Sequence, residues 1–298
     1  MTRTDTPLSQ RQIWMLATRP KTLPAAAAPV VVGTAVAIAE GAFAAGPALA
    51  ALLGALLLQI GSNLANDVFD YKKGADTSAR LGPTRVTQAG FLSPRQVLTG
   101  MWLTFGLAAL IGLYLIWVGG WPIIAIGVLS IAAAIAYTGG PFPLGYHGLG
   151  DLFVFIFFGL AAVCGTYYVQ AGTVSGLAWL AAVPVGGLIV NILVVNNLRD
   201  IESDRAAGKR TLAVRLGVRG AQVEYLLWLV VAYAVPPLLG LFGLASGWLM
   251  LTWLSLPAAL SPTRLVLHKQ GRILNQALAG SARFALIYSL LFAVGLLL

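Results

Sequence analysis

The chain has 298 residues, of which 58% are hydrophobic and only 10% are charged. So little charge excludes an ordinary soluble domain and indicates a protein with several transmembrane helices. The apolar runs are continuous rather than alternating, which excludes a transmembrane β-barrel, and the single cysteine excludes an internal disulfide.

Nine apolar segments, most of them near the ~20 residues that a helix needs to cross a bilayer, predict nine transmembrane helices. In chain order they are 22–39, 47–66, 97–118, 121–138, 149–171, 176–197, 223–243, 245–260 and 277–298. The basic segment 1–21 that precedes them lacks the short apolar core and cleavage site of a signal peptide. We therefore expect an all-α membrane protein in which residues 1–298 form one domain.

The distribution of basic residues supports this topology. With a cytoplasmic N-terminus, the inside segments are 1–21, 67–96, 139–148, 198–222 and 261–276. They hold every Lys and Arg except Arg283, and the outside loops hold none. Because positive charge stays cytoplasmic, the C-terminus is expected outside. The net charge of +9 is then explained by topology and by attraction of an anionic substrate, and we expect no nucleic-acid partner.

Two acidic clusters end long apolar segments, where charge is costly and predicts a functional site. The first cluster comprises Asn63, Asn66, Asp67 and Asp70, and the second comprises Asn196, Asn197, Asp200 and Asp204. Residues four and seven apart share a face of a helix. Each helix end therefore presents two carboxylates and an amide oxygen in one direction.

The two clusters also form a weak internal repeat. A shift of 134 residues places Asn63 on Asn197, Asp70 on Asp204 and Gly74 on Gly208. Both copies close a predicted span and open a basic cytoplasmic loop. This pattern predicts two similar half-sites that face one cavity.

Oxygen ligands without His or Cys favour a hard cation, Mg²⁺ first. Mg²⁺ held by few carboxylates usually takes other ligands from phosphate, so we expect a diphosphate substrate. Arg85, Arg199, Arg205 and Lys209 lie beside the clusters and can contact phosphate oxygens. Metal and cations together would stabilise a departing diphosphate, and an allylic diphosphate would leave a cation that must be kept from water.

Two alternatives compete with this interpretation. The clusters can be solvated helix ends that only terminate a span. They can also bind Na⁺ or H⁺ in a secondary transporter, although transporter sites usually lie near the middle of the membrane.

Two further residues lie on the predicted cytoplasmic side. Tyr137 ends the fourth segment, where its ring can face an aromatic substrate or a cation or serve as an interfacial tyrosine. Asp151 opens the fifth segment, either as a helix N-terminal residue or as a polar group in the cavity.

These motifs resemble those of the UbiA-type intramembrane aromatic prenyltransferases. The segments that carry the resemblance are Arg19-Pro20-Lys21-Thr22-Leu23-Pro24, Asn66-Asp67-Val68-Phe69-Asp70, Gly82-Pro83-x-Arg85, Tyr146-x2-Leu149-Gly150-Asp151, Asp200-x3-Asp204 and Gly208-Lys209-x-Thr211-Leu212. The resemblance extends over residues 19–219 and is greatest to the branch of the family that prenylates 1,4-dihydroxy-2-naphthoate.

The resemblance implies nine helices around a central cavity in the bacterial cytoplasmic membrane, with the acidic motifs at the cytoplasmic mouth. It implies Mg²⁺-dependent transfer of a polyprenyl group from polyprenyl diphosphate to 1,4-dihydroxy-2-naphthoate, with release of CO₂ and diphosphate and formation of demethylmenaquinone. Other acceptors of the family, such as 4-hydroxybenzoate, homogentisate or a tetrapyrrole, stay as alternatives because the acidic motifs are common to all of them.

Site residues are carried over by position. The residues expected to hold Mg²⁺ are Asn63, Asp67, Asp70, Asp200 and Asp204. Those expected to contact substrate are Asn63, Asn66, Asn197, Arg85, Arg199, Lys209, Lys21 and Asp151, with Tyr137 near the aromatic ring. Many relatives carry Asp eight residues after the equivalent of Asn66, where this chain has Gly74, and the nearest acid is Asp76.

Overall fold

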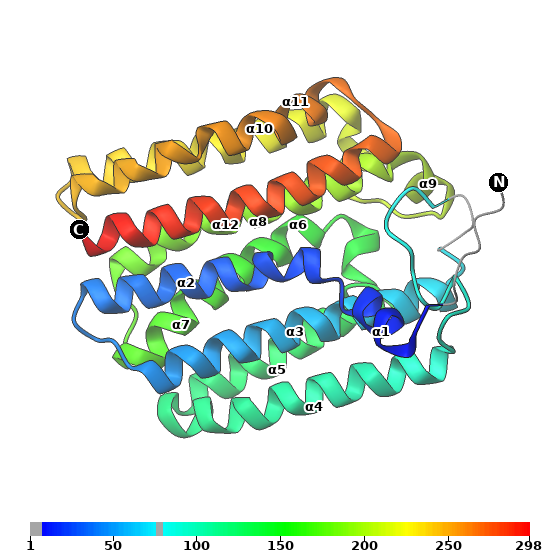
Figure 1. Ribbon diagram of the computed structural model, residues 1–298, viewed down its shortest axis with the longest axis horizontal. Coiled ribbons are helices and arrows are strands. Elements are labelled where there is room, and N and C mark those ends of the chain that lie inside the picture. The colour runs from blue at the N-terminus through cyan, green and yellow to red at the C-terminus, as the bar shows by residue number, and fades with distance from the viewer. Residues whose placement is uncertain (1–7, 76–79) are drawn as a thin grey trace.

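The computed structural model describes residues 8–75 and 80–298, and long helices dominate it (Figure 1). The elements are α1 (Gln10–Thr18), η1 (Pro20–Thr22), α2 (Leu23–Ala39), α3 (Ala45–Lys72), α4 (Pro94–Gly119), α5 (Trp121–Ala136), η2 (Leu144–His147), α6 (Gly150–Val154), η3 (Phe155–Ala161), α7 (Ala162–Ala171), α8 (Gly176–Arg199), α9 (Ile201–Ala206), α10 (Leu212–Leu241), η4 (Gly247–Ser255), α11 (Leu256–His268), η5 (Gly271–Ile273) and α12 (Leu274–Leu297).

Local sequence signals explain where several of these helices begin. Ser9 and Ser93 each form a capping box with a glutamine three residues later, and so begin α1 and α4. The hydroxyls of Ser175 and Thr211 accept backbone N–H groups at the starts of α8 and α10. Inside α10, Gly217 has a φ of 72°, so the helix is kinked near its beginning.

Seven helical segments of the described chain are long and apolar enough to cross a membrane, whereas the sequence predicts nine. The predicted spans 121–138 and 245–260 account for the difference. The first is the helix Trp121–Ala136, which has only 16 residues. The second becomes the 3₁₀ segment Gly247–Ser255 followed by Leu256–His268. The predicted all-helical membrane architecture is confirmed, and the count of nine is not.

The long helices run side by side along the long axis of the molecule (Figure 1). The end of α3, residues 80–93 before α4 and the short helix α9 gather at one end, and α12 terminates at the other (Figure 1). Helix α8 is the most enclosed span, with 78% of its apolar window buried, because a helix that is apolar on all sides is stable only when surrounded.

A π-helical stretch, η3, interrupts the rod that runs from Gly150 to Ala171. Gly159 in this stretch lies directly against Gly186 of α8, where a Cβ on either residue would meet backbone. The absence of side chains therefore lets the two helices approach closely. The wider turn of η3 also carries Phe157 and Phe158, which line the cavity described below.

Candidate functional site

A cavity of about 550 Å³ runs between the helices. Its walls along α4, α5 and η3 are mainly apolar, whereas the end near α9 carries the polar groups. The predicted site residues that line it are Asn63, Asn66, Asp70, Arg85, Tyr137, Asn197, Asp200, Asp204 and Lys209. The two acidic clusters therefore meet at one mouth, as the internal repeat predicts.

Lys209 lies between the two clusters. Its Nζ is 3.6 Å from Asp70 Oδ1 and 3.5 Å from Asp204 Oδ1. Burial raises the pKa of the Asp204 carboxyl to about 6, although the neighbouring Lys209 ammonium opposes the rise. A single cation thus links carboxylates that belong to α3 and α9.

The repeat extends to the backbone beside these carboxylates. The carbonyl of Asp70 accepts the N–H of Ala75, and the carbonyl of Asp204 accepts the N–H of Lys209. Gly74 and Gly208 stand just before these donors, with positive φ of 66° and 72°. Such a left-handed glycine ends a helix and turns the chain back. Both half-sites therefore place a carboxylate one helical turn before a glycine that caps the helix.

Asp70 has the densest set of partners. Arg85 Nη2 donates to its Oδ2 at 2.9 Å, and the Tyr146 hydroxyl donates to its Oδ1 at 2.8 Å. Two ammonium groups lie near the Tyr146 ring, with Lys209 Nζ 4.6 Å and Lys73 Nζ 5.0 Å from its centroid. These distances are typical of cation–π contacts. The sequence offers Tyr146 as a possible contact for an aromatic ring or a cation, or as an interfacial tyrosine, and does not indicate its hydrogen bond to Asp70.

Asp200 is held by its neighbour in sequence. Arg199 donates from Nε to Oδ1 at 2.8 Å and from Nη2 to Oδ2 at 2.5 Å. The same guanidinium bonds Asn196 and Asn275, and Asn275 donates to the carbonyl of Leu81. Arg199 is 2% exposed and does not line the cavity. Its predicted contact with substrate is therefore corrected to positioning of Asp200 and of the loop near Leu81.

The structure does not bring Asp67 to the cavity. Its two carboxylate oxygens accept the backbone N–H groups of Val86 and Thr87, at 3.0 Å and 3.1 Å, and it is 1% exposed. A helix advances about 100° per residue, which turns Asp67 away from the face that Asn66 and Asp70 share. The predicted role of Asp67 as metal ligand is corrected to an anchor for the loop that carries Arg85.

The amide groups of the first cluster have different environments. Asn63 Nδ2 donates to the Thr18 carbonyl at 3.0 Å and to Thr22 Oγ1 at 2.9 Å, which ties α3 to the N-terminal segment. Asn66 Oδ1 accepts from Thr138 Oγ1 at 3.0 Å and faces the mouth. Both residues line the cavity, and the metal role of Asn63 stays a prediction, but Asn66 is the amide on the same face of α3 as Asp70.

Lys21 is exposed and does not line the cavity, contrary to its predicted contact with substrate. Arg19 lines the cavity in its place. The left-handed conformation of Arg19, with a φ of 51°, ends α1 and begins a new turn. This reversal separates the directions of the two side chains, and no pattern in the sequence indicates it.

Asp151 also differs from its predicted place. It lines a separate, smaller cavity between α6, α8 and α10, rather than the cavity that holds Asp70 and Asp204. Its predicted contact with substrate is therefore not supported. Asp76 lies outside the described residues.

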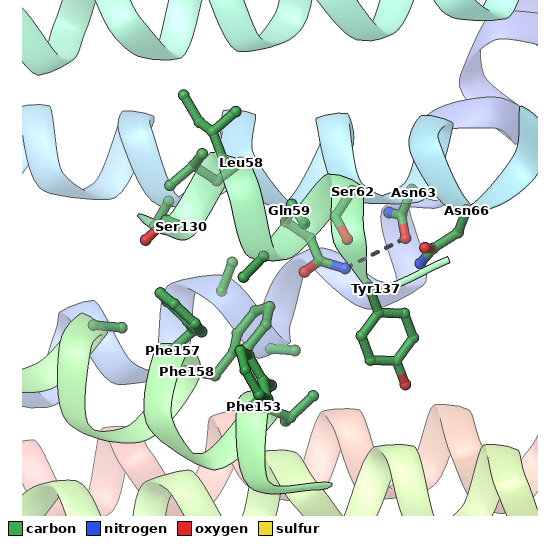
Figure 2. Close-up of a pocket in the computed structure, with 18 of the residues that line it drawn as sticks. Leu58, Gln59, Ser62, Asn63, Asn66, Ser130, Tyr137, Phe153, Phe157 and Phe158 are labelled. Carbon is green, nitrogen blue, oxygen red and sulfur yellow. Dashed lines mark hydrogen bonds between the residues drawn. The ribbon is translucent and has the colours of Figure 1, made fainter. Parts of the chain in front are cut away.

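The opposite wall of the cavity is aromatic. Figure 2 shows the polar side chains of Gln59 and Ser62 on α3 across from Phe153, Phe157 and Phe158. Tyr137, at the end of α5, lies between this wall and the mouth (Figure 2). A cation formed at the mouth would therefore face aromatic rings and little water.

The described residues contain no group of three His, Cys, Asp or Glu side chains placed to hold a metal without other ligands. Carboxylates of Asp70, Asp200 and Asp204 and the amide oxygen of Asn66 nevertheless line one mouth. Such an all-oxygen set fits Mg²⁺ that takes its other ligands from a substrate phosphate and water. The donor set therefore fits Mg²⁺ only together with an anionic substrate.

Comparison with known proteins gives the family. The sequence profile of the UbiA prenyltransferase family matches residues 26–296. The chain belongs to this family. It is 40% identical over 302 residues to 1,4-dihydroxy-2-naphthoate octaprenyltransferase of Escherichia coli, covering 99% of this chain and 98% of the relative. It is 43% identical to the protein of the same name from Mycobacterium tuberculosis, with 83% of each chain covered.

A solved structure supports the fold. A UbiA homologue from Archaeoglobus fulgidus, bound to DMAPP and Mg²⁺, superposes with a TM-score of 0.60 over 94% of this chain and 99% of that chain. The sequence identity is 15%, so the likeness concerns the fold alone. Together with the apolar helices, the family membership makes this an integral membrane protein.

Proposed function

We propose that the protein transfers a polyprenyl group from polyprenyl diphosphate to 1,4-dihydroxy-2-naphthoate, forming demethylmenaquinone with release of CO₂ and diphosphate. The observation that carries the proposal is the meeting of two acidic half-sites, bridged by Lys209, at the mouth of a cavity with an aromatic wall. Relatives at 40% and 43% identity that carry the naphthoate prenyltransferase name support the choice of acceptor.

In this proposal, the side chains that would hold Mg²⁺ together with the diphosphate are Asp70, Asp200, Asp204 and Asn66, and Arg85 and Lys209 would contact the diphosphate; all six line the cavity. Bound Mg²⁺ would supply positive charge that stabilises the departing diphosphate oxygens. The diphosphate brings the negative charge that lets Lys209 exchange one carboxylate partner for a phosphate oxygen. Tyr146 keeps Asp70 oriented while this exchange takes place.

Ionisation breaks the bond between the allylic carbon and the diphosphate oxygen, and the electron pair leaves with the diphosphate. Phe153, Phe157 and Phe158 exclude water from the cation and offer it their ring faces. Tyr137 positions the naphthoate ring, and Arg19 offers a guanidinium to its carboxylate. The carboxylate-bearing carbon then bonds to the allylic carbon, and loss of CO₂ returns an electron pair to the ring.

The full chain, 1–298, is proposed to form one domain with nine membrane crossings. The helix Trp121–Ala136 and the segment Gly247–His268 would supply the two crossings beyond the seven long spans. The acid-bearing mouth, the basic loops and the N-terminal segment 1–21 would face the cytoplasm of a bacterium, and the C-terminus would lie outside. Acids at one end of the bundle, rather than at its middle, argue against the transporter alternative.

A product assay tests the proposal. Purified protein in nanodiscs receives a polyprenyl diphosphate, Mg²⁺ and either 1,4-dihydroxy-2-naphthoate or 4-hydroxybenzoate, and products are identified by mass. We expect a prenylated, decarboxylated naphthoquinol that is absent after EDTA treatment. Product from 4-hydroxybenzoate alone would reject the acceptor, and no product from either compound with folded protein would reject the proposed activity.

A further inference from the structure

A second cavity lies on the membrane-facing side of the bundle, and the reaction proposed above does not use it. It measures about 270 Å³ and is lined by Asp151, Leu152, Phe155, Val190, Glu224 and Trp228. We call it the lateral pocket. Leu152 is 54% exposed, and Val223 and Leu227 of α10 are 54% and 59% exposed. In a transmembrane helix such side chains contact lipid, so the lateral pocket opens towards the bilayer.

Two carboxyl groups converge on this pocket. Asp151 is only 8% exposed, and neither of its carboxylate oxygens has a hydrogen-bond partner among the described residues. Glu224, half-buried on α10, lines the same space. A buried carboxylate without partners is costly, and these oxygens can accept N–H donors from a ligand.

The remaining lining residues indicate which kind of cation fits. Phe155 and Trp228 stack with their ring centroids 5.2 Å apart, and the other walls are aliphatic. Two carboxyls on an apolar and aromatic floor are too few oxygen ligands for a divalent metal ion. They suit an organic ammonium, which donates N–H groups to the carboxylates and lies against the indole ring.

We propose that the lateral pocket binds the primary ammonium of an aminophospholipid, such as phosphatidylethanolamine, from the leaflet on the side of the acidic clusters. A primary ammonium offers three N–H donors to Asp151 and Glu224, whereas the quaternary ammonium of phosphatidylcholine offers none.

Native mass spectrometry of the purified, full-length protein tests this assignment. The protein is titrated with an equimolar mixture of dioleoyl-phosphatidylethanolamine and dioleoyl-phosphatidylcholine, and the retained lipid is counted. We expect retention of phosphatidylethanolamine to exceed that of phosphatidylcholine by about fivefold or more, as charge-assisted hydrogen bonds would give. Equal retention of the two lipids would overturn the proposal.

Variants localise the preference. Glu224→Gln and Asp151→Asn each preserve side-chain shape and should bring the ratio of retained lipids close to one. Glu202→Gln removes an exposed carboxylate that pairs with Arg205 outside the pocket and should keep the preference. An unchanged ratio in both pocket variants would overturn the proposal, and if one variant elutes as an aggregate, the other decides.

A final arm separates lipid from soluble amine. Glycerophosphoethanolamine, which has the same headgroup without acyl chains, is added at the concentration of the lipid. We expect no displacement of bound phosphatidylethanolamine, because the exposed apolar side chains around the lateral pocket contribute to binding of the lipid acyl chains. Displacement at equal concentration would assign the pocket to a soluble amine and reject the lipid as its ligand.

Discussion

Replacing Asp67 with asparagine tests whether Asp67 only anchors the loop, while Asp70 takes part in the reaction. The two oxygens of Asp67 accept N–H groups of Val86 and Thr87 inside the protein. In Asp67→Asn one of these donors faces an NH₂ group and loses its acceptor. An unpaired buried donor costs about 1–3 kcal/mol. At about 2–4 °C per kcal/mol for a large domain, the melting temperature should fall by about 2–12 °C.

The chemical consequences should be small by comparison. Below the melting transition, Asp67→Asn should keep turnover and the same Mg²⁺ requirement, because Asp67 does not line the cavity. The matched variant Asp70→Asn changes the residue three positions later, which lines the mouth and contacts Arg85. Its turnover should fall by at least about 100-fold, the usual cost of losing one electrostatic group of an active site.

Thermal unfolding in detergent and initial rates across a Mg²⁺ titration measure both quantities. If Asp67→Asn melts like the unchanged protein but needs about tenfold more Mg²⁺, a shift typical of a disturbed metal site, then Asp67 is a metal ligand and not a loop anchor. If Asp70→Asn turns over at a normal rate, then Asp70 takes no part in the reaction.

Three further changes test neighbouring contacts. Tyr146→Phe removes the hydroxyl that bonds Asp70 but keeps the ring near Lys73 and Lys209, so kcat should fall by roughly tenfold, about the worth of one net hydrogen bond, without a change in melting temperature. Tyr146→Leu should lower both. Arg199→Lys cannot reproduce the bidentate grip on Asp200, and scanning calorimetry should show a lower melting temperature. Gly127 lines the cavity, and a Cβ at this position meets nothing within 4 Å. Gly127→Phe should therefore shift competition between short and long prenyl diphosphates towards the short one; an unchanged preference would remove Gly127 from the path of the prenyl chain.

The sequence predicts the membrane fold and the place of the site well because both depend on large free energies. Long apolar runs lie in lipid, and charge at their ends is costly, so it indicates a functional site. The equivalence of Asp70 and Asp204 follows from the repeat, and the structure places both beside Lys209.

The sequence does not predict the directions of individual side chains. Asp67 and Asp70 are three residues apart and both acidic, and the loop amides of Val86 and Thr87 hold the Asp67 carboxylate on the side of α3 that faces away from the cavity. Arg19 lines the cavity where Lys21 is predicted to do so, because Arg19 itself adopts a left-handed conformation. Such outcomes depend on contacts between segments that are remote in sequence, and no local pattern indicates them.

Asp151 shows the same limit at a larger scale. Its position at the start of a predicted span suggests the substrate cavity, and its neighbours in sequence do lie close to that cavity. The carboxylate nevertheless lies in the lateral pocket with Glu224, a residue 73 positions later on α10. Only the packing of α6 against α8, which α10 also contacts, determines which cavity the side chain lines.

In the proposed reaction the two acidic half-sites hold one diphosphate through Mg²⁺. Equilibrium binding of an inert thiolo analogue of a prenyl diphosphate measures this without turnover. We expect binding in Mg²⁺, its loss in EDTA, and affinity weakened by about tenfold or more in both Asp70→Asn and Asp204→Asn, one from each half-site. Equal affinity with and without Mg²⁺, or weakening in only one of the two variants, would contradict this proposal.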